Sequence, residues 1–119
     1  MAREDEYRRW VERYVVAWQS NDPADIAALF SENGRYFTEP YAAPWEGREA
    51  IVRGWLDHKD EPGDTTFDYD VLVSTQEIGL VKGVTKYASS GKTYSNLWEI
   101  RLDASGDCTE FVEWWMERP

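Results

Sequence analysis

Residues 92–116 read KTYSNLWEIRLDASGDCTEFVEWWM, and they predict two long β-strands, 92–102 and 108–116, on either side of the loop 104–107. The two flanks are rich in aromatic and apolar residues, which favour strands, and the loop ASGD consists of turn-forming residues. Two more strands are expected immediately upstream, at 66–73 and 78–88. The second half of the chain therefore predicts four consecutive strands joined by short turns, which is an antiparallel meander.

The first half of the chain predicts helices instead. Apolar side chains recur at the spacing of one helix face, at Tyr7, Trp10, Val11, Tyr14 and Trp18. This helix is expected to end near Ser20, and a second, short helix follows directly. Either Asn21 or Asp22 can cap the second helix, because both side chains accept a hydrogen bond from a first-turn N–H, and Pro23 suits its first position.

A short strand and a third helix complete the first half. Asn33-Gly34 predicts a turn, residues 35–39 predict a strand that Pro40 ends, and residues 41–47 predict a loop. Residues 48–59 again have helical periodicity.

Helices gathered ahead of hairpin-linked strands are typical of an α+β fold. We expect one domain over residues 1–119, with three N-terminal helices packed on one face of a curved, mostly antiparallel sheet. Such a sheet closes like a cone whose interior can remain partly empty, and ligands favour hollows of that kind.

Composition excludes several classes of function. The chain has 13 Lys and Arg against 23 Asp and Glu, a net charge of -10, so nucleic acid and anionic membranes are not expected as partners. One His and one Cys give no zinc-site spacing, and no loop has the oxygen pattern of a calcium site, so neither metal nor cofactor is expected. The sequence has no apolar run of about 18 residues and no apolar signal segment, which predicts a cytoplasmic protein.

Strand parity predicts which side chains enter the hollow, because successive side chains point to opposite faces. In strand 92–102 the even positions are the more apolar set and should face the helices; they are Tyr94, Asn96, Trp98, Ile100 and Leu102. In strand 108–116 both faces are apolar, with Phe111, Glu113 and Trp115 on one and Val112, Trp114 and Met116 on the other. Parity leaves open which of these two faces points inward. Because a monomer needs only one apolar face, the second one predicts a homodimer.

The whole chain resembles the SnoaL-like branch of the NTF2-like superfamily, which includes ketosteroid isomerases, polyketide cyclases and limonene epoxide hydrolases. Four features carry the resemblance: the first helix with Tyr14, the segment DPADIAALFSENGRYFTEP, the segment WEGREAIVRGW, and the hairpin RLDASGDCTEFVEWW. The resemblance implies the conical fold, and it implies that Phe111, Glu113 and Trp115 lie on the concave face. Because this fold carries enzymes, binding proteins and transport factors alike, it does not imply one activity.

The resemblance also suggests catalytic positions. Ketosteroid isomerases have a hydrogen-bonding Tyr on helix 1, an acidic base just before a Pro, and an acidic oxyanion donor on the penultimate strand. Tyr14 matches the first position and Glu39, followed by Pro40, matches the second, whereas Trp98 occupies the third. An indole N–H can donate a hydrogen bond but cannot act as a protonated acid, which argues against steroid isomerisation.

The candidate catalytic residues are therefore Glu39 as base, Glu113 as a second acid and Tyr14 as a hydrogen-bond donor. Each has a structural alternative: Glu39 paired with an Arg at the rim, Glu113 satisfied by a buried donor, and Tyr14 as a plain core residue. The candidate ligand-binding residues are Trp45, Trp55, His58, Asn96, Trp98, Phe111 and Trp115. The aromatic members could equally be core residues, and His58 could simply be a helix C-terminal cation.

Three functions remain compatible with this pattern. The first is a cofactor-independent isomerase, cyclase or dehydratase that acts on a small hydrophobic, oxygen-bearing molecule. The second is a non-catalytic module that binds such a molecule. The third is a dimeric interaction protein whose own side chains fill the hollow.

Overall fold

The computed structural model describes residues 3–119. Its elements, in chain order, are α1 (Glu4–Ser20), α2 (Pro23–Ala27), β1 (Phe30–Phe37), β2 (Trp45–Glu46), α3 (Arg48–Asp57), β3 (Thr65–Ser74), β4 (Gly79–Tyr87), β5 (Thr93–Leu102) and β6 (Cys108–Glu117). Asp22 is the residue that caps α2, since its side chain accepts a hydrogen bond of 2.8 Å from the N–H of Ala24.

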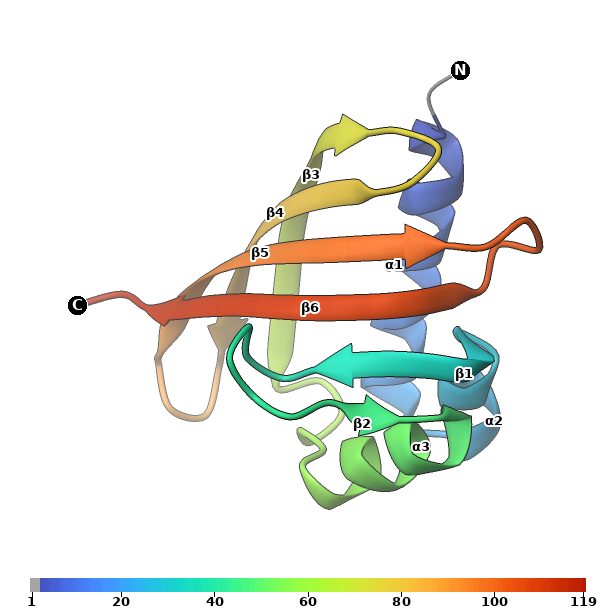
Figure 1. The fold of residues 1–119 in the computed structure, drawn as a ribbon. Helices are drawn as coiled ribbons and strands as arrows, with labels where there is room; N and C mark the ends of the chain where they lie inside the picture. The colour runs from blue at the N-terminus through green and yellow to red at the C-terminus, as the bar shows by residue number, and fades with distance from the viewer. Residues whose placement is uncertain (1–2) are drawn as a thin grey trace.

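The six strands form one curved, mixed sheet in the order β2-β1-β6-β5-β4-β3. The predicted meander is confirmed, because β3, β4, β5 and β6 pair antiparallel with their chain neighbours. The first strand, β1, lies beside the last strand, β6, and pairs with it in parallel. In Figure 1, α1 crosses behind the sheet, and α2 and α3 lie at its lower edge. Residues 3–119 contain three helices, but they are not all N-terminal, since α3 follows the predicted short strand β1 and also β2, so the expectation of three N-terminal helices holds only in part.

The predicted turn at Asn33-Gly34 is wrong, because both residues lie inside β1. The pairing of β1 with β6 changes register between Phe30 and Arg35. A Cβ at Gly34 would lie 3.0 Å from the carbonyl oxygen of Cys108, so glycine allows a close approach of two strands here. The strand also ends at Phe37 and does not reach residue 39.

The predicted loop 41–47 contains the short strand β2, in which Trp45 pairs with Tyr36 and Glu46 pairs with Arg35. Two residues are too few to show a strand period in the sequence. This pairing places the indole of Trp45 beside the ring of Tyr36, with centroids 4.9 Å apart.

The core lies between α1 and the concave face of the sheet. The predicted face of α1 is buried at Tyr7, Trp10, Val11 and Tyr14, whereas Trp18 is only partly buried. The even face of β5 also points inward as predicted, with Asn96, Trp98, Ile100 and Leu102 buried. Phe111 is fully buried, so the odd face of β6 is the inner one.

The alternation of side chains along β3 breaks near its end. Phe67, Tyr69 and Val71 pack against the core, whereas Val73 is 45% exposed. The pairing of β3 with β4 is irregular between Val71 and Val73, and such a bulge turns the following side chain to the other face.

Within residues 3–119, no helix has the length and apolar character needed to span a membrane.

Candidate functional site

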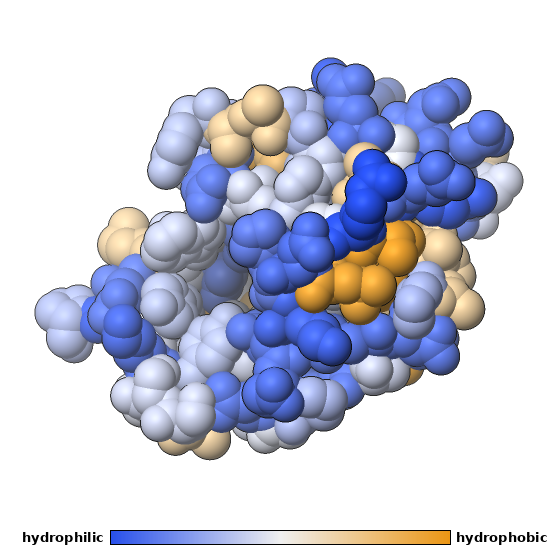
Figure 2. Space-filling view, turned by 90° about the horizontal axis from the view of Figure 1, so that it is seen from below, coloured by the Kyte–Doolittle hydropathy of each residue, from blue (hydrophilic) through white to orange (hydrophobic). Residues whose placement is uncertain are grey.

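A cavity of about 630 Å³ opens between α1, the segment after α3 and the concave face of the sheet. Viewed from below, the surface is mostly hydrophilic and is hollowed on this side (Figure 2). Eight aromatic side chains contribute to the wall: Tyr14, Trp18, Tyr36, Trp45, Trp55, Tyr87, Tyr94 and Trp115. The polar part of the wall includes three carboxylates, from Glu39, Asp60 and Glu113.

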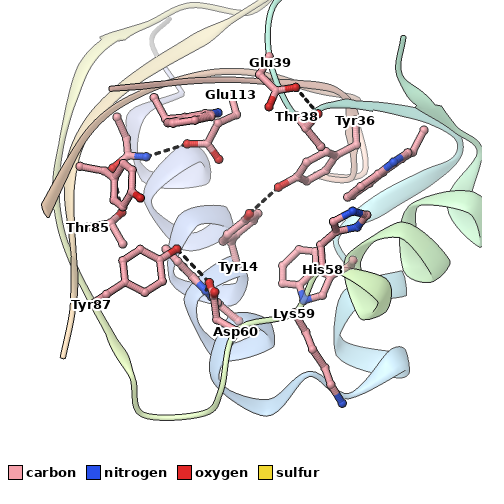
Figure 3. Close-up of a pocket in the computed structure, with 16 residues that line it drawn as sticks. Tyr14, Tyr36, Thr38, Glu39, His58, Lys59, Asp60, Thr85, Tyr87 and Glu113 are labelled. Atoms are coloured by element: carbon pink, nitrogen blue, oxygen red, sulfur yellow. Dashed lines mark hydrogen bonds between the residues drawn. The ribbon is translucent and has the colours of Figure 1, made fainter. Parts of the chain in front are cut away.

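Glu113 on β6 lies beside the buried side chains of Asn96 and Trp98. Its Oε2 accepts hydrogen bonds from Asn96 Nδ2 and Trp98 Nε1, each 2.8 Å long. The other oxygen, Oε1, points into the cavity (Figure 3). Burial raises the pKa of Glu113 to about 7 and the nearby charge of Glu39 adds to the rise, although the bonds from Trp98 and Asn96 oppose it. A carboxyl group with this pKa can accept or donate a proton near neutral pH.

Glu39 lies in the segment after β1, at the same end of the cavity as Glu113 (Figure 3). Its Oε1 accepts a hydrogen bond of 2.8 Å from the hydroxyl of Thr38, and its side chain is half-buried. The sequence placed Glu39 and Glu113 in one pocket, and both line this cavity. Neither forms an ion pair with a cationic residue in the described part of the chain.

Two phenols meet at the base of the cavity. The hydroxyls of Tyr14 on α1 and Tyr36 on β1 are 2.7 Å apart and hydrogen bonded (Figure 3). Burial raises the pKa of both tyrosines far above the ordinary value, so both stay neutral. Since one O–H is used within the pair, the second remains available to an acceptor in the cavity.

Asp60 holds the opposite end of the cavity. Its Oδ2 accepts hydrogen bonds from Trp18 Nε1 at 2.9 Å and from the hydroxyl of Tyr87 at 3.1 Å. Asn21, at the end of α1, fixes the position of this segment. Its Nδ2 donates to the backbone oxygen of Asp60 at 2.9 Å, and its Oδ1 accepts from Trp55 Nε1 at 3.1 Å.

His58 and Trp45 form the wall beside α3. The imidazole stacks on the indole with centroids 5.8 Å apart, and its Nδ1 lies 2.9 Å from the carbonyl oxygen of Gly54. The expected C-terminal position of His58 is confirmed, because it directly follows Asp57 and caps the end of α3. Gly54 is required at its position, since any Cβ there would overlap the ring of Trp45.

Most of the residues that the sequence proposed for the site line this one cavity. They are Tyr14, Glu39, Trp45, Trp55, His58, Asn96, Glu113 and Trp115, of which Trp115 is half-exposed at the rim. Trp98 and Phe111 are not part of the wall. Both are buried behind it, where Trp98 supports Glu113 and Phe111 packs on Tyr14 and Tyr36.

Sequence reasoning missed Asp60, Tyr36 and Tyr87 as residues of the cavity. Tyr36 lies near the end of the predicted strand that precedes Glu39, so the alternation of side chains along that strand could have placed Tyr36 on the inner face. Asp60 lies in an irregular segment after α3, and no periodic signal reaches it.

Comparison with known proteins supports the fold. The chain superposes over its full length on 84% of a putative ketosteroid isomerase from Kribbella flavida, with a TM-score of 0.75 and 17% identity. It also matches an NTF2-like protein of unknown function from Mesorhizobium loti, with a TM-score of 0.72, 20% identity and coverage of 98% of this chain and 95% of that one. No curated protein matches the sequence significantly.

The family is identified by sequence. A model of the SnoaL-like domain matches residues 11–114, which include the C-terminal half of α1, the sheet except for the end of β6, and all three cavity carboxylates. The match, the conical mixed sheet and the structural neighbours agree with one another. The chain therefore belongs to the SnoaL-like domain family, and its fold is similar to that of NTF2-like proteins.

Proposed function

We propose that this protein binds a small hydrophobic, oxygen-bearing molecule in the cavity, where Glu113 transfers a proton in a reaction of the isomerase, cyclase or dehydratase type, without a cofactor. One observation carries the proposal. A carboxyl group with a pKa of about 7 is fixed by two donors on a single oxygen, and the other oxygen faces a cavity of about 630 Å³. Groups with such a pKa cluster at functional sites.

The roles of the acids differ from those suggested by the resemblance. Glu39 was the expected base, but Glu113 is fixed by two donors, and burial raises its pKa, with a further contribution from the charge of Glu39. We therefore assign the proton transfer to Glu113 and a tuning role to Glu39. A carboxylate at Glu113 would take a proton from a carbon beside a ligand carbonyl and return it at another position.

The tyrosine pair supplies the matching electrophilic group. When the ligand loses a proton from carbon, negative charge develops on its carbonyl oxygen. The free O–H of the Tyr14–Tyr36 pair can donate a hydrogen bond to that oxygen, and both phenols remain neutral because burial raises their pKa. The proton transfer is balanced, because Glu113 returns one proton to the ligand for each one it accepts, and its carboxyl group can exchange that proton with solvent before returning it.

The test follows hydrogen exchange in a panel of hydrophobic ketones in D₂O by NMR. The wild-type protein should speed exchange beside the carbonyl in at least one ketone, and Glu113→Gln should reduce that rate at least about 100-fold. The glutamine retains an oxygen that accepts from Asn96 and Trp98, so ketone binding should persist. Glu61→Gln, which removes an exposed carboxylate outside the cavity, is the control. Unchanged exchange in Glu113→Gln would show that another group moves the proton.

We also propose that the outer face of the sheet forms a homodimer interface. Trp114 is 46% exposed and Met116 is 69% exposed on the outer side of β6, while Tyr41 is 88% exposed. Together with Leu97 they line a second, apolar groove on this side of the sheet. An apolar area of this kind is unusual on a monomer.

A further inference from the structure

The cavity holds more negative than positive charge. Glu39, Asp60 and Glu113 line it, and the described residues contain no ion pair that involves any of them. The cationic side chain on the wall is that of Lys59. Its amine extends away from all three carboxylates (Figure 3). The carboxylates are therefore not neutralised by the protein itself.

Two of these carboxylates are held in the same way at opposite ends of the cavity. Glu113 accepts from the indole of Trp98 and the amide of Asn96, both on Oε2. Asp60 accepts from the indole of Trp18 and the hydroxyl of Tyr87, both on Oδ2. All four donors are neutral. They fix the position of each carboxylate and satisfy one of its oxygens, but they do not cancel its charge.

The aromatic part of the wall is also suited to a positively charged ligand. Eight aromatic rings line the cavity, four from Trp and four from Tyr. The faces of these rings are negative, and they attract organic cations with an energy that increases when water is excluded. An anion would be repelled by three carboxylates, and a neutral ligand would gain no charge–charge attraction from them.

A metal ion does not fit this arrangement. Within residues 3–119, no group of three or more His, Cys, Asp or Glu side chains is close enough to hold one. The carboxylates are instead spread around an aromatic cavity of about 630 Å³, which has the size of an organic ligand site.

We propose that the ligand of this cavity carries a positively charged nitrogen, such as a protonated or quaternary amine, attached to its hydrophobic, oxygen-bearing body. The unpaired carboxylates of Asp60, Glu113 and Glu39 balance that charge, and the surrounding Trp and Tyr rings contact the nitrogen substituents. This inference rests on the proposed function, because it assumes that the cavity binds a small molecule. Beyond the proposed function, it states that this molecule is positively charged.

The test compares a cationic probe with its neutral isostere and with an anion on the same methoxyphenyl ring. The cation is para-methoxyphenyl-trimethylammonium, its neutral carbon isostere is para-tert-butylanisole, and the anion is para-methoxybenzenesulfonate. Affinities are measured by tryptophan fluorescence and calorimetry at about pH 8, where the carboxyl group of Glu113 is mostly ionised, since its pKa is about 7. The wild-type protein should bind the cation at least about tenfold more tightly than the isostere, and the anion more weakly than either.

Variants locate the charge effect. Asp60→Asn and Glu113→Gln each keep an oxygen that accepts the neutral donors, so each should reduce the affinity for the cation at least about threefold and leave that for the isostere unchanged. Glu61→Gln removes the same charge from an exposed site outside the cavity and should change neither affinity. Near-ultraviolet circular dichroism confirms that each variant is folded. If a variant does not fold, the relative affinities of the three probes for the wild-type protein still test the charge class of the ligand.

The outcomes separate this inference from the proposed function. If the isostere binds as tightly as the cation, or if the cation retains its advantage in both variants, the charge class is wrong while the cavity remains a ligand site. If none of the three probes binds, both the charge class and the proposed function are contradicted.

Discussion

The raised pKa of Glu113 predicts an unusual dependence of stability on pH. Folding moves the pKa of this carboxyl group from 4.5 to about 7, mainly because burial disfavours the charged form. The unfolded chain therefore releases the proton at lower pH than the folded protein does. The favourable contribution of Glu113 is complete below pH 4.5 and is lost as pH rises through about 7.

The size of the effect follows from the shift. A change of one pKa unit corresponds to about 1.4 kcal/mol, so the shift of Glu113 makes the folded state about 3 kcal/mol less stable at high pH than it would be with a neutral group. Glu113→Gln is permanently neutral and keeps the acceptor for Asn96 and Trp98. Its free energy of unfolding, relative to wild type, should therefore rise by about 3 kcal/mol between about pH 4 and about pH 9.

Urea denaturation followed by circular dichroism across this pH range measures the difference. The other titratable groups on the cavity wall are Glu39, Asp60, His58, Lys59 and the tyrosines Tyr14, Tyr36, Tyr87 and Tyr94. Because these are the same in both proteins, the subtraction removes their direct contribution. Glu61→Gln reports the effect of net charge alone. A difference between Glu113→Gln and wild type that stays flat with pH would refute a desolvated Glu113.

Three further substitutions test the fold and the site. Tyr36→Phe removes the partner of the buried Tyr14 hydroxyl and should lower the free energy of unfolding by about 1–2 kcal/mol in urea titrations; no loss would contradict the hydroxyl pair. Gly54→Ala should lower the melting temperature, although alanine normally stabilises a helix by about 1 kcal/mol, because the added Cβ overlaps Trp45; an increase would show that the ring does not pack there. Trp114→Lys should convert a dimer to a monomer in light scattering, and the same mass for both proteins would argue against the proposed outer-face interface.

The sequence was most informative where a period extends over many residues. The apolar face of α1 spans about three turns of helix, and the even positions of β5 alternate over ten residues, so both buried faces could be predicted. It was least informative where the backbone departs from a regular period. The bulge in β3 and the two-residue strand β2 leave no periodic signal, and Gly34 has the composition of a turn although a close contact between strands requires it.

The same contrast applies to the site. Tyr14, Glu39 and Glu113 could be proposed from the sequence because each lies on or directly after a regular element that the family resemblance helps to place. The resemblance also favoured Glu39 as the base, but it could not indicate how much water reaches each carboxylate. Desolvation depends on every group packed around a side chain, and those groups come from segments far apart in the chain.

The sequence alone determined the α+β fold class, the inward faces of α1 and β5, and the presence of acids and phenols among aromatic residues, because these depend on local periods and composition. Only the tertiary structure decided that β1 inserts beside β6, that Asp60 joins the cavity, and that Trp98 supports Glu113 from behind the wall. Each of these depends on contacts between residues distant in sequence, and the burial that sets the pKa of Glu113 arises only when those contacts have formed.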